Sequence, residues 1–124
     1  MKNINKEFIP YEEALTLKKL GFDEPCFGYF SELQQLHLCR FENMSDKGFV
    51  SAPTYSQAFR WFREVYGLDC FIDKGGIKGI YHAFVGGSEH GFLYGNNGNR
   101  PSEFTYEEAE LACLKKLIEI TKTK

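Results

Sequence analysis

The side chains best suited to bind a ligand in this sequence lie together around its single tryptophan. Trp61 is flanked by Arg60 and Arg63, and an aromatic plane beside guanidinium groups can stack on a nucleobase or hold a phosphate. The same stretch also suits a packing helix, because Phe62 and Tyr66 continue an apolar stripe at helical spacing. We favour packing and keep a small-ligand or nucleotide site as the alternative.

A fourth candidate ligand residue lies in a separate loop. Arg100 follows a stretch of glycine and asparagine, residues 95–99, and loops on a rigid scaffold often carry binding residues. The predicted ligand-binding set is Arg60, Trp61, Arg63 and Arg100.

Cysteine and histidine could supply metal-binding or nucleophilic chemistry. His37 and Cys39 alternate in one stretch, Cys26 lies nearby, and zinc accepts both types of side chain. However, the spacing matches no zinc pattern, and the four cysteines include no Cys-x-x-Cys pair. We therefore predict free thiols, no metal, no cofactor and no catalytic residue, so the chain is expected not to be an enzyme. In an exported chain, two disulfides would be the alternative.

Three helices are predicted to position these residues, and their ends carry recognisable signals. The central helix begins with a capping box, Thr54 and Gln57, and ends at Gly67. Thr105 and Glu108 repeat the capping box at the start of the last helix. The predicted spans are residues 10–20, 53–67 and 105–120.

Alternating and aromatic runs between the helices predict six short strands. They cover residues 26–30, 36–41, 49–52, 68–73, 77–85 and 91–94, with turns at 74–76 and 86–90. We predict a single α+β domain over residues 1–124. It contains an antiparallel β-sheet of roughly four to six strands, with the central and last helices on one face of a C-terminal α-β-β-β-α unit. An N-terminal helix and β-hairpin extend it.

Length and charge narrow the classes of partner. The chain has 124 residues, 43% of them hydrophobic, and a formal net charge of -2 with both signs mixed along the sequence. This balance argues against a general surface for nucleic acid or anionic membrane. The first residues lack the apolar run of a signal peptide, and no stretch approaches a membrane span. We expect a cytoplasmic protein that does not enter a membrane.

Three stretches within residues 8–120 are distinctive as sequence. They are FIPYEEA with GFDEPCFGY (residues 8–14 and 21–29), the Pro53–Gly67 stretch, and YEEAELACL (residues 106–114). Together they resemble an uncharacterised family of small proteins encoded by gut bacteria and by their phages and mobile elements. The resemblance implies a bacterial or phage protein in the host cytoplasm, and it implies no activity.

From residue 53 onward, the predicted order of elements is similar to a double-stranded-RNA-binding domain. That fold family contacts RNA with basic residues at the start of its last helix. Here the corresponding residues are Glu107, Glu108 and Glu110. The order is therefore an indication of fold alone, and binding of double-stranded RNA or DNA is not expected.

These observations predict a non-enzymatic accessory protein that binds a protein partner or associates with itself, with a homodimer as one form. The alternative is a small-ligand or nucleotide-binding protein that uses the aromatic and arginine surface around Trp61 and Arg100. A deep pocket containing Trp61 would favour the alternative. A flat apolar patch would favour protein binding.

Overall fold

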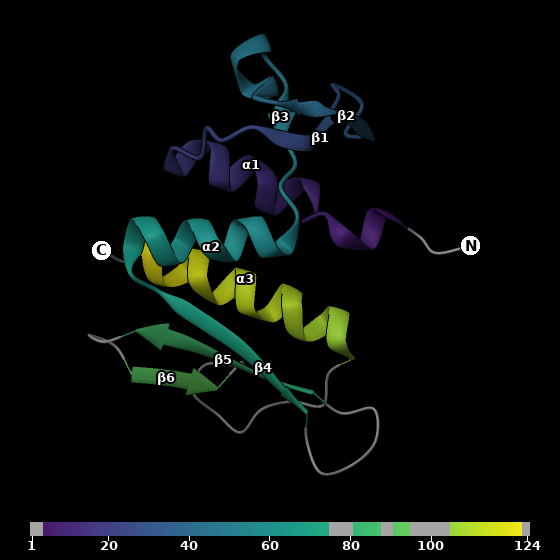
Figure 1. Ribbon diagram of the computed structural model, residues 1–124. Helices are drawn as coiled ribbons and strands as arrows, with labels where there is room; N and C mark the ends of the chain where they lie inside the picture. The colour runs from purple at the N-terminus through teal and green to yellow at the C-terminus, as the bar shows by residue number, and fades with distance from the viewer. Residues whose placement is uncertain (1–3, 75–80, 88–90, 95–104, 123–124) are drawn as a thin grey trace. The chain divides into compact units, whose positions relative to one another are not determined.

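The computed structural model describes residues 4–74, 81–87, 91–94 and 105–122, and it has the predicted α+β architecture (Figure 1). The elements in chain order are η1 (Ile4–Glu7), α1 (Tyr11–Leu20), β1 (Cys26–Phe30), β2 (Leu36–Glu42), η2 (Met44–Lys47), β3 (Val50–Ser51), α2 (Tyr55–Tyr66), β4 (Asp69–Lys74), β5 (Tyr81–Gly87), β6 (Gly91–Tyr94) and α3 (Tyr106–Lys122).

The chain falls into two compact units, and the boundary lies within α2. Residues 1–58 form the N-terminal unit, and residues 59–124 form the C-terminal unit. The single domain over residues 1–124 stays a prediction.

Helix α1 begins and ends where its sequence signals predict. It starts after Pro10, whose fixed φ suits a helix entry. At the other end Gly21 takes φ 104°, a left-handed conformation that favours glycine, and its N–H donates to the carbonyl of Lys18 at 3.1 Å. The buried side of α1 consists of Ala14 and Leu17, and the helix contacts β3.

The N-terminal unit contains an antiparallel sheet with the strand order β2-β1-β3. Residues of its middle strand alternate between two environments, as a strand period of two requires. Cys26, Gly28 and Phe30 are buried, whereas Phe27 is exposed and Tyr29 is half-buried. One face of this sheet therefore contributes to the core, and the other carries aromatic rings outward.

The C-terminal unit contains a second antiparallel sheet with the order β4-β5-β6. Helix α3 packs against β5 and β4 (Figure 1). A broad apolar stripe on α3 makes this packing possible, and its buried members are Ala109, Cys113, Leu114, Leu117 and Ile118. Trp61, Phe62 and Val85 are also buried.

Two structural expectations need correction. In the described part of the chain, the strands do not form one sheet of four to six strands but two sheets of three. This follows because β4 pairs with β5, its neighbour in sequence, rather than with the two-residue strand β3. The turn expected at residues 86–90 is also wrong at its start, since Gly86 and Gly87 remain in β5 opposite Phe92 and Gly91. Most of the turn expected at residues 74–76 and the start of the strand expected at residues 77–85 lie outside the described residues. The same holds for residues 88–90 of the second expected turn.

Candidate functional site

The structure separates the tryptophan of the predicted ligand site from its arginines. Trp61 is only 5% exposed, and its ring packs edge to face on Phe62 at 5.0 Å and on Tyr66 at 5.4 Å. Arg60 and Arg63 are exposed. Residues three apart lie on one face of a helix, whereas neighbours are about 100° apart, so the two guanidinium groups share a face that excludes the indole.

Arg100, the fourth predicted ligand residue, lies outside the described residues. Arg60 and Arg63 therefore lie on one exposed face of α2, and the ligand-binding role of the four residues stays a prediction. The geometry of α2 does support the packing interpretation of Trp61, because its indole contacts other aromatic rings of the same helix.

The four cysteines are free thiols, as predicted. Burial, followed by the nearby Glu24 carboxylate and the Cys39 thiol, raises the pKa of Cys26 to about 12. A hydrogen bond with Cys113, together with burial, raises the pKa of Cys70. Because the thiolate is the nucleophile and the metal ligand, these two thiols are protonated and inert at neutral pH. Among the described residues, no three His, Cys, Asp or Glu side chains gather in a way that could hold a metal.

Aromatic side chains lie on the outward face of the β2-β1-β3 sheet in two groups. Phe27 and Phe41 lie with ring centroids 4.8 Å apart, and Tyr29 stacks on His37 at 5.3 Å. Tyr29 also contacts Phe49 at 4.9 Å. We call these five residues the aromatic surface.

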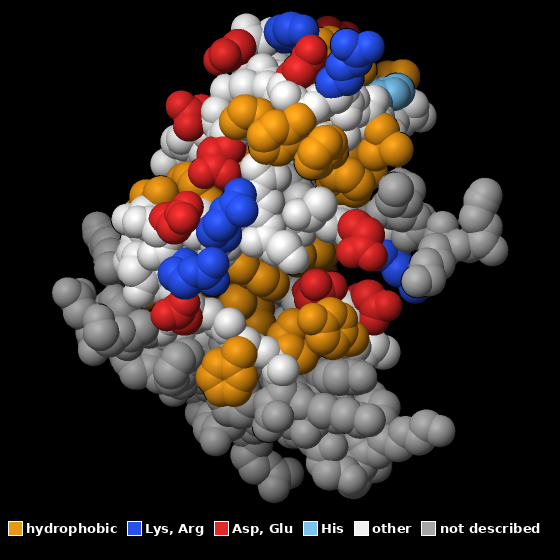
Figure 2. All heavy atoms as spheres, viewed as in Figure 1, with side chains coloured by type: hydrophobic (Ala, Val, Ile, Leu, Met, Phe, Trp, Pro, Cys, Tyr) orange, Lys and Arg blue, Asp and Glu red, His pale blue; other side chains and the backbone are white. Residues whose placement is uncertain are grey.

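The outer end of the aromatic surface is open to solvent. Phe27 is 56% exposed and Phe41 is 53% exposed, although aromatic side chains of this size usually bury most of their area. Figure 2 shows hydrophobic side chains gathered over the N-terminal unit, with charged side chains of both signs at their border. A contiguous apolar patch with a polar rim is typical of an interaction site.

Strand β2 is the second unusual feature of this unit. It is an edge strand, since in the described part of the chain it pairs with β1 alone. Most of its side chains are exposed. Leu38 is 58% exposed, and it lies on the same face of the sheet as its register partner Gly28. The register between β1 and β2 shifts before the last pair, Cys26 with Glu42.

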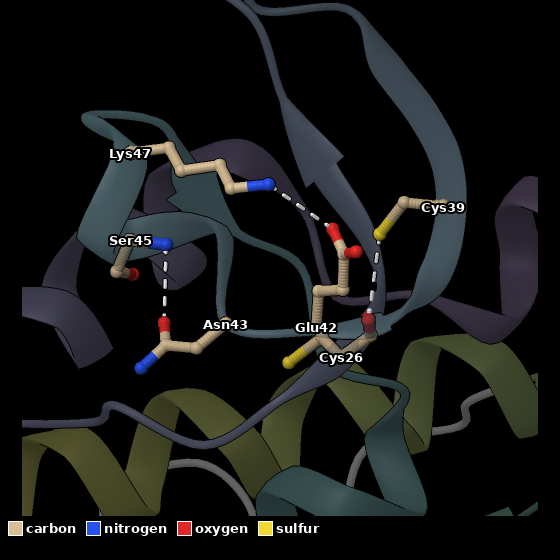
Figure 3. Close-up of polar contacts among 6 residues, drawn as sticks. All are labelled: Cys26, Cys39, Glu42, Asn43, Ser45 and Lys47. Atoms are coloured by element: carbon tan, nitrogen blue, oxygen red, sulfur yellow. Dashed lines mark hydrogen bonds and ion pairs between the residues drawn. The ribbon is translucent and has the colours of Figure 1, made fainter.

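Three separate polar contacts lie around the end of β2 (Figure 3). Lys47 Nζ lies 3.4 Å from Glu42 Oε2, and the backbone N–H of Ser45 donates to Asn43 Oδ1 at 3.1 Å. On the other side, the Cys39 thiol donates to the Cys26 carbonyl at 3.4 Å. These contacts mark the point where β2 ends and η2 begins.

The sequence predictions missed the aromatic surface and placed the candidate ligand site on the central helix instead. A signal was present in the predicted hairpin, where Cys26 and Phe30 alternate with Phe27 and Tyr29. When both alternating sets of a strand are apolar, a sheet with one covered face must expose one of them. The alternation alone does not say which set is exposed.

No protein-family model, curated protein or solved structure matches the chain. In the part of the chain that the structure describes, no helix has both the length and the apolar character needed to cross a lipid bilayer.

Proposed function

We propose that the chain is a non-enzymatic binding module of a phage or mobile element, and that it binds protein through β2 and the aromatic surface. The observation that carries the proposal is the contact between Phe27 and Phe41, two rings 4.8 Å apart that are each more than half exposed. The phage or mobile-element origin and the bacterial cytoplasm are supported by the sequence resemblance alone.

Aromatic side chains of this kind suit a protein interface energetically. A large rigid ring gives much contact area for little conformational entropy, and such residues are enriched among those that dominate binding energy. Arg40 and Glu42 on β2 are exposed and carry opposite charges, so they can form the polar rim around the rings. Truncating an anchor residue typically costs roughly 2 kcal/mol, or about 30-fold in affinity.

The charge of the N-terminal unit favours protein over nucleic acid. Aromatic rings on a sheet can also stack with single-stranded bases, but such proteins combine the rings with a positively charged groove. Residues 1–58 contain six Lys and Arg against eight Asp and Glu. Without a net positive charge, the attraction to phosphates that supplies most non-specific nucleic-acid affinity is missing.

The small-ligand alternative has weaker support. It needs an aromatic plane that can face a ligand beside Arg60 and Arg63, and the indole of Trp61 is buried. The two exposed guanidinium groups remain available to an anion, but nothing else among the described residues distinguishes them from an ordinary solvated helix face.

Native mass spectrometry of the tagged chain, purified from a gut-bacterial host lysate, tests the proposal. We expect a protein partner or a second copy at fixed stoichiometry. The complex should weaken by at least about 30-fold when Phe27 and Phe41 are both replaced by Ser.

Phe71→Ser is the matched control, because Phe71 is a strand phenylalanine with 46% exposure on β4. It should leave the complex intact. Equal complex formation by the wild-type chain and the Phe27→Ser/Phe41→Ser variant would contradict the proposal. A retained small molecule with no protein partner would support the alternative instead.

A further inference from the structure

The four cysteines fall into two pairs, one in each compact unit. Cys26 and Cys39 belong to the N-terminal unit, and Cys70 and Cys113 belong to the C-terminal unit. A disulfide needs two sulfur atoms about 2.05 Å apart and Cβ atoms about 3.8 Å apart. What each sulfur atom faces therefore decides which pair can be linked.

In the N-terminal pair, each thiol bonds to a backbone oxygen rather than to the other thiol. The Cys39 thiol donates to the Cys26 carbonyl at 3.4 Å, and the Cys26 thiol donates to the Glu24 carbonyl at 3.5 Å. Figure 3 shows that the Cys26 carbonyl, and not its sulfur, faces Cys39. A disulfide here would break both bonds and turn the fully buried Cys26 side chain out of its place, so we expect these two residues to remain thiols.

In the C-terminal pair, the two thiols form a hydrogen bond with each other. Cys70 lies on β4, and Cys113 lies on the buried stripe of α3, the helix that packs on β4. A separate contact places the Cys113 sulfur at the same point of the strand, because it lies 3.9 Å from the carbonyl oxygen of Phe71, the residue after Cys70. Both side chains therefore enter the same space between strand and helix.

We propose that Cys70 and Cys113 form a disulfide when the chain folds in the presence of a low-molecular-weight disulfide, and that this bond ties α3 to β4. Sulfur atoms that already contact each other need only a change of side-chain torsions to reach bonding distance. The inference does not depend on the proposed protein binding, because the aromatic surface belongs to the other unit.

The reaction consists of two thiol–disulfide exchanges, here with oxidised glutathione as the oxidant. The thiolate of one cysteine attacks a glutathione sulfur, the S–S bond of the oxidant breaks, and one glutathione leaves. The thiolate of the second cysteine then attacks the cysteine sulfur of this mixed disulfide, and the second glutathione leaves. The two cysteines lose two protons and two electrons in total, and the oxidant gains them as two glutathione thiols.

Burial determines when this exchange can occur. In the folded, reduced chain the hydrogen bond with Cys113 and burial raise the pKa of Cys70, and Cys113 is fully buried, so neither is an effective nucleophile at neutral pH. In the unfolded chain both thiols are open to the oxidant, and the pKa of Cys70 is near its ordinary value of 9.0. The disulfide therefore forms during folding, whereas a chain that has folded in the reduced form stays reduced.

Oxidative refolding of the full chain tests the proposal. Reduced chain in urea is diluted into native buffer with oxidised and reduced glutathione, the remaining thiols are blocked with iodoacetamide, and peptides are mapped by mass spectrometry. We expect a peptide pair linked through Cys70 and Cys113, with Cys26 and Cys39 blocked. Reduced chain that is folded first and then placed in the same buffer at pH 7 should form the disulfide at least about tenfold more slowly.

Serine variants identify the residues that form the bond. Cys26→Ser and Cys39→Ser are the matched controls and should still form the disulfide, whereas Cys70→Ser should form none. Cys70 is the better position for this test, because it is only half-buried and Cys113 is fully buried. Circular dichroism confirms that each variant is folded.

The stability of the oxidised chain tests the tie between α3 and β4. A disulfide that closes the loop over residues 71–112 restricts the unfolded chain, so it should lower the unfolding equilibrium constant by at least about tenfold. Urea denaturation with and without a reductant measures this difference, and Cys70→Ser should show none.

Three results would overturn the inference. One is a chain that refolds in the glutathione buffer with four free thiols, and another is a disulfide between any other two cysteines. An oxidised chain whose urea midpoint equals that of the reduced chain would show that the bond does not tie α3 to β4. Equal rates for the folding and the folded chain would show that formation of the bond is not coupled to folding.

Discussion

The two sheets that the structure describes, β2-β1-β3 and β4-β5-β6, differ in how they are covered. In the C-terminal unit, α3 packs on β4 and β5 with five hydrophobic residues buried on its stripe. In the N-terminal unit, five of the seven residues of β2 are exposed, and the rings of Phe27 and Phe41 face outward. The difference shows that strand-forming sequence is not enough to bury a sheet. A capped amphipathic helix of sufficient length must also be available to cover it.

The largest predicted effect is on the covered sheet. Replacing Leu117, which is fully buried on α3, with Ala should lower the free energy of unfolding by about 2–5 kcal/mol, because the change removes buried methyl groups and leaves a cavity. The corresponding change on the open sheet, Leu38→Ala, should cost less than about 0.5 kcal/mol. Urea denaturation followed by Trp61 fluorescence and by circular dichroism measures both.

Leu117→Ala and Leu38→Ala make the same chemical change, so a difference larger than the roughly 1 kcal/mol range of helix and strand propensities reports on burial. If Leu38→Ala proved as destabilising as Leu117→Ala, then β2 would be covered in solution, and the contrast between the two sheets would disappear.

A smaller effect is the pH dependence of the free energy of unfolding that arises from Cys26, a buried thiol on β1. The pKa of Cys26 is raised from its ordinary value of 9.0 to about 12, so the folded state holds the proton more tightly than the unfolded chain. Stability from this thiol is complete below pH 9 and is lost as the pH rises toward 12. The slope in that interval is about 1.4 kcal/mol per pH unit. Cys70, whose pKa is also raised, adds a slope of the same sign.

Urea midpoints between about pH 8 and pH 10.5 test this linkage. Cys26→Ala should flatten the decline relative to the wild type, although it lowers stability at neutral pH by removing a buried side chain. Cys39→Ala should flatten the decline less, because that thiol is only half-buried, although burial raises its pKa too. An unchanged pH slope in Cys26→Ala would show that Cys26 is not held protonated by the fold.

Helix caps give the third effect, and one of them begins α3, the helix that covers the C-terminal sheet. At the start of α3, the Glu108 N–H donates to Thr105 Oγ1 at 3.1 Å, and the Thr105 N–H donates to Glu108 Oε1 at 2.8 Å. Thr105→Ala removes one of these bonds and should cost about 1 kcal/mol.

Thr16→Ala is the control for the cap. The Thr16 hydroxyl donates to the carbonyl of Glu12 in its own helix, a bond that does little for helix stability. This change should fall within about 0.5 kcal/mol of zero, because alanine is also the better helix former. Equal losses for Thr105→Ala and Thr16→Ala would remove the cap as the explanation.

The sequence predicted the helices well because their signals are local. The α2 start at Thr54 is confirmed, since the Gln57 N–H donates to Thr54 Oγ1 at 3.2 Å, and Gly67 ends the helix with φ 68°. The α+β class followed from the same signals and from alternation in the strands. These features depend on residues within a few positions of one another, so a single sequence contains them.

The division into two sheets and the candidate site were harder to predict. Which strands pair depends on contacts far apart in sequence, and alternation at Phe27 and Tyr29 fits either an inward or an outward face. Trp61 illustrates the reverse case, a residue that the sequence offered as a ligand-binding candidate and the fold buries. Beside two arginines it looked available to a ligand, but its position on α2 buries it. Exposure is a property of the packed fold, and residue type alone does not determine it.

The smallest predicted effect compares an ion pair from each region. Lys47 and Glu42 lie 3.4 Å apart near β2, and Lys116 and Glu119 lie 3.3 Å apart on α3. The distances are nearly equal, but the side chain of Lys47 is 59% exposed and that of Lys116 is 11% exposed. Water and salt screen the first pair, whereas the buried methylene groups of Lys116 contribute packing as well as charge.

Lys47→Ala should therefore change the free energy of unfolding by less than about 0.5 kcal/mol. Lys116→Ala should cost more, mainly through lost packing, so its loss should persist when the ionic strength is raised. Urea midpoints at low and high NaCl distinguish the two contributions. The contradicting result would be a loss of unfolding free energy for Lys47→Ala that matches the loss for Lys116→Ala and vanishes at high salt. Charge would then dominate at both sites. The difference in burial between the two ion pairs would have no energetic consequence.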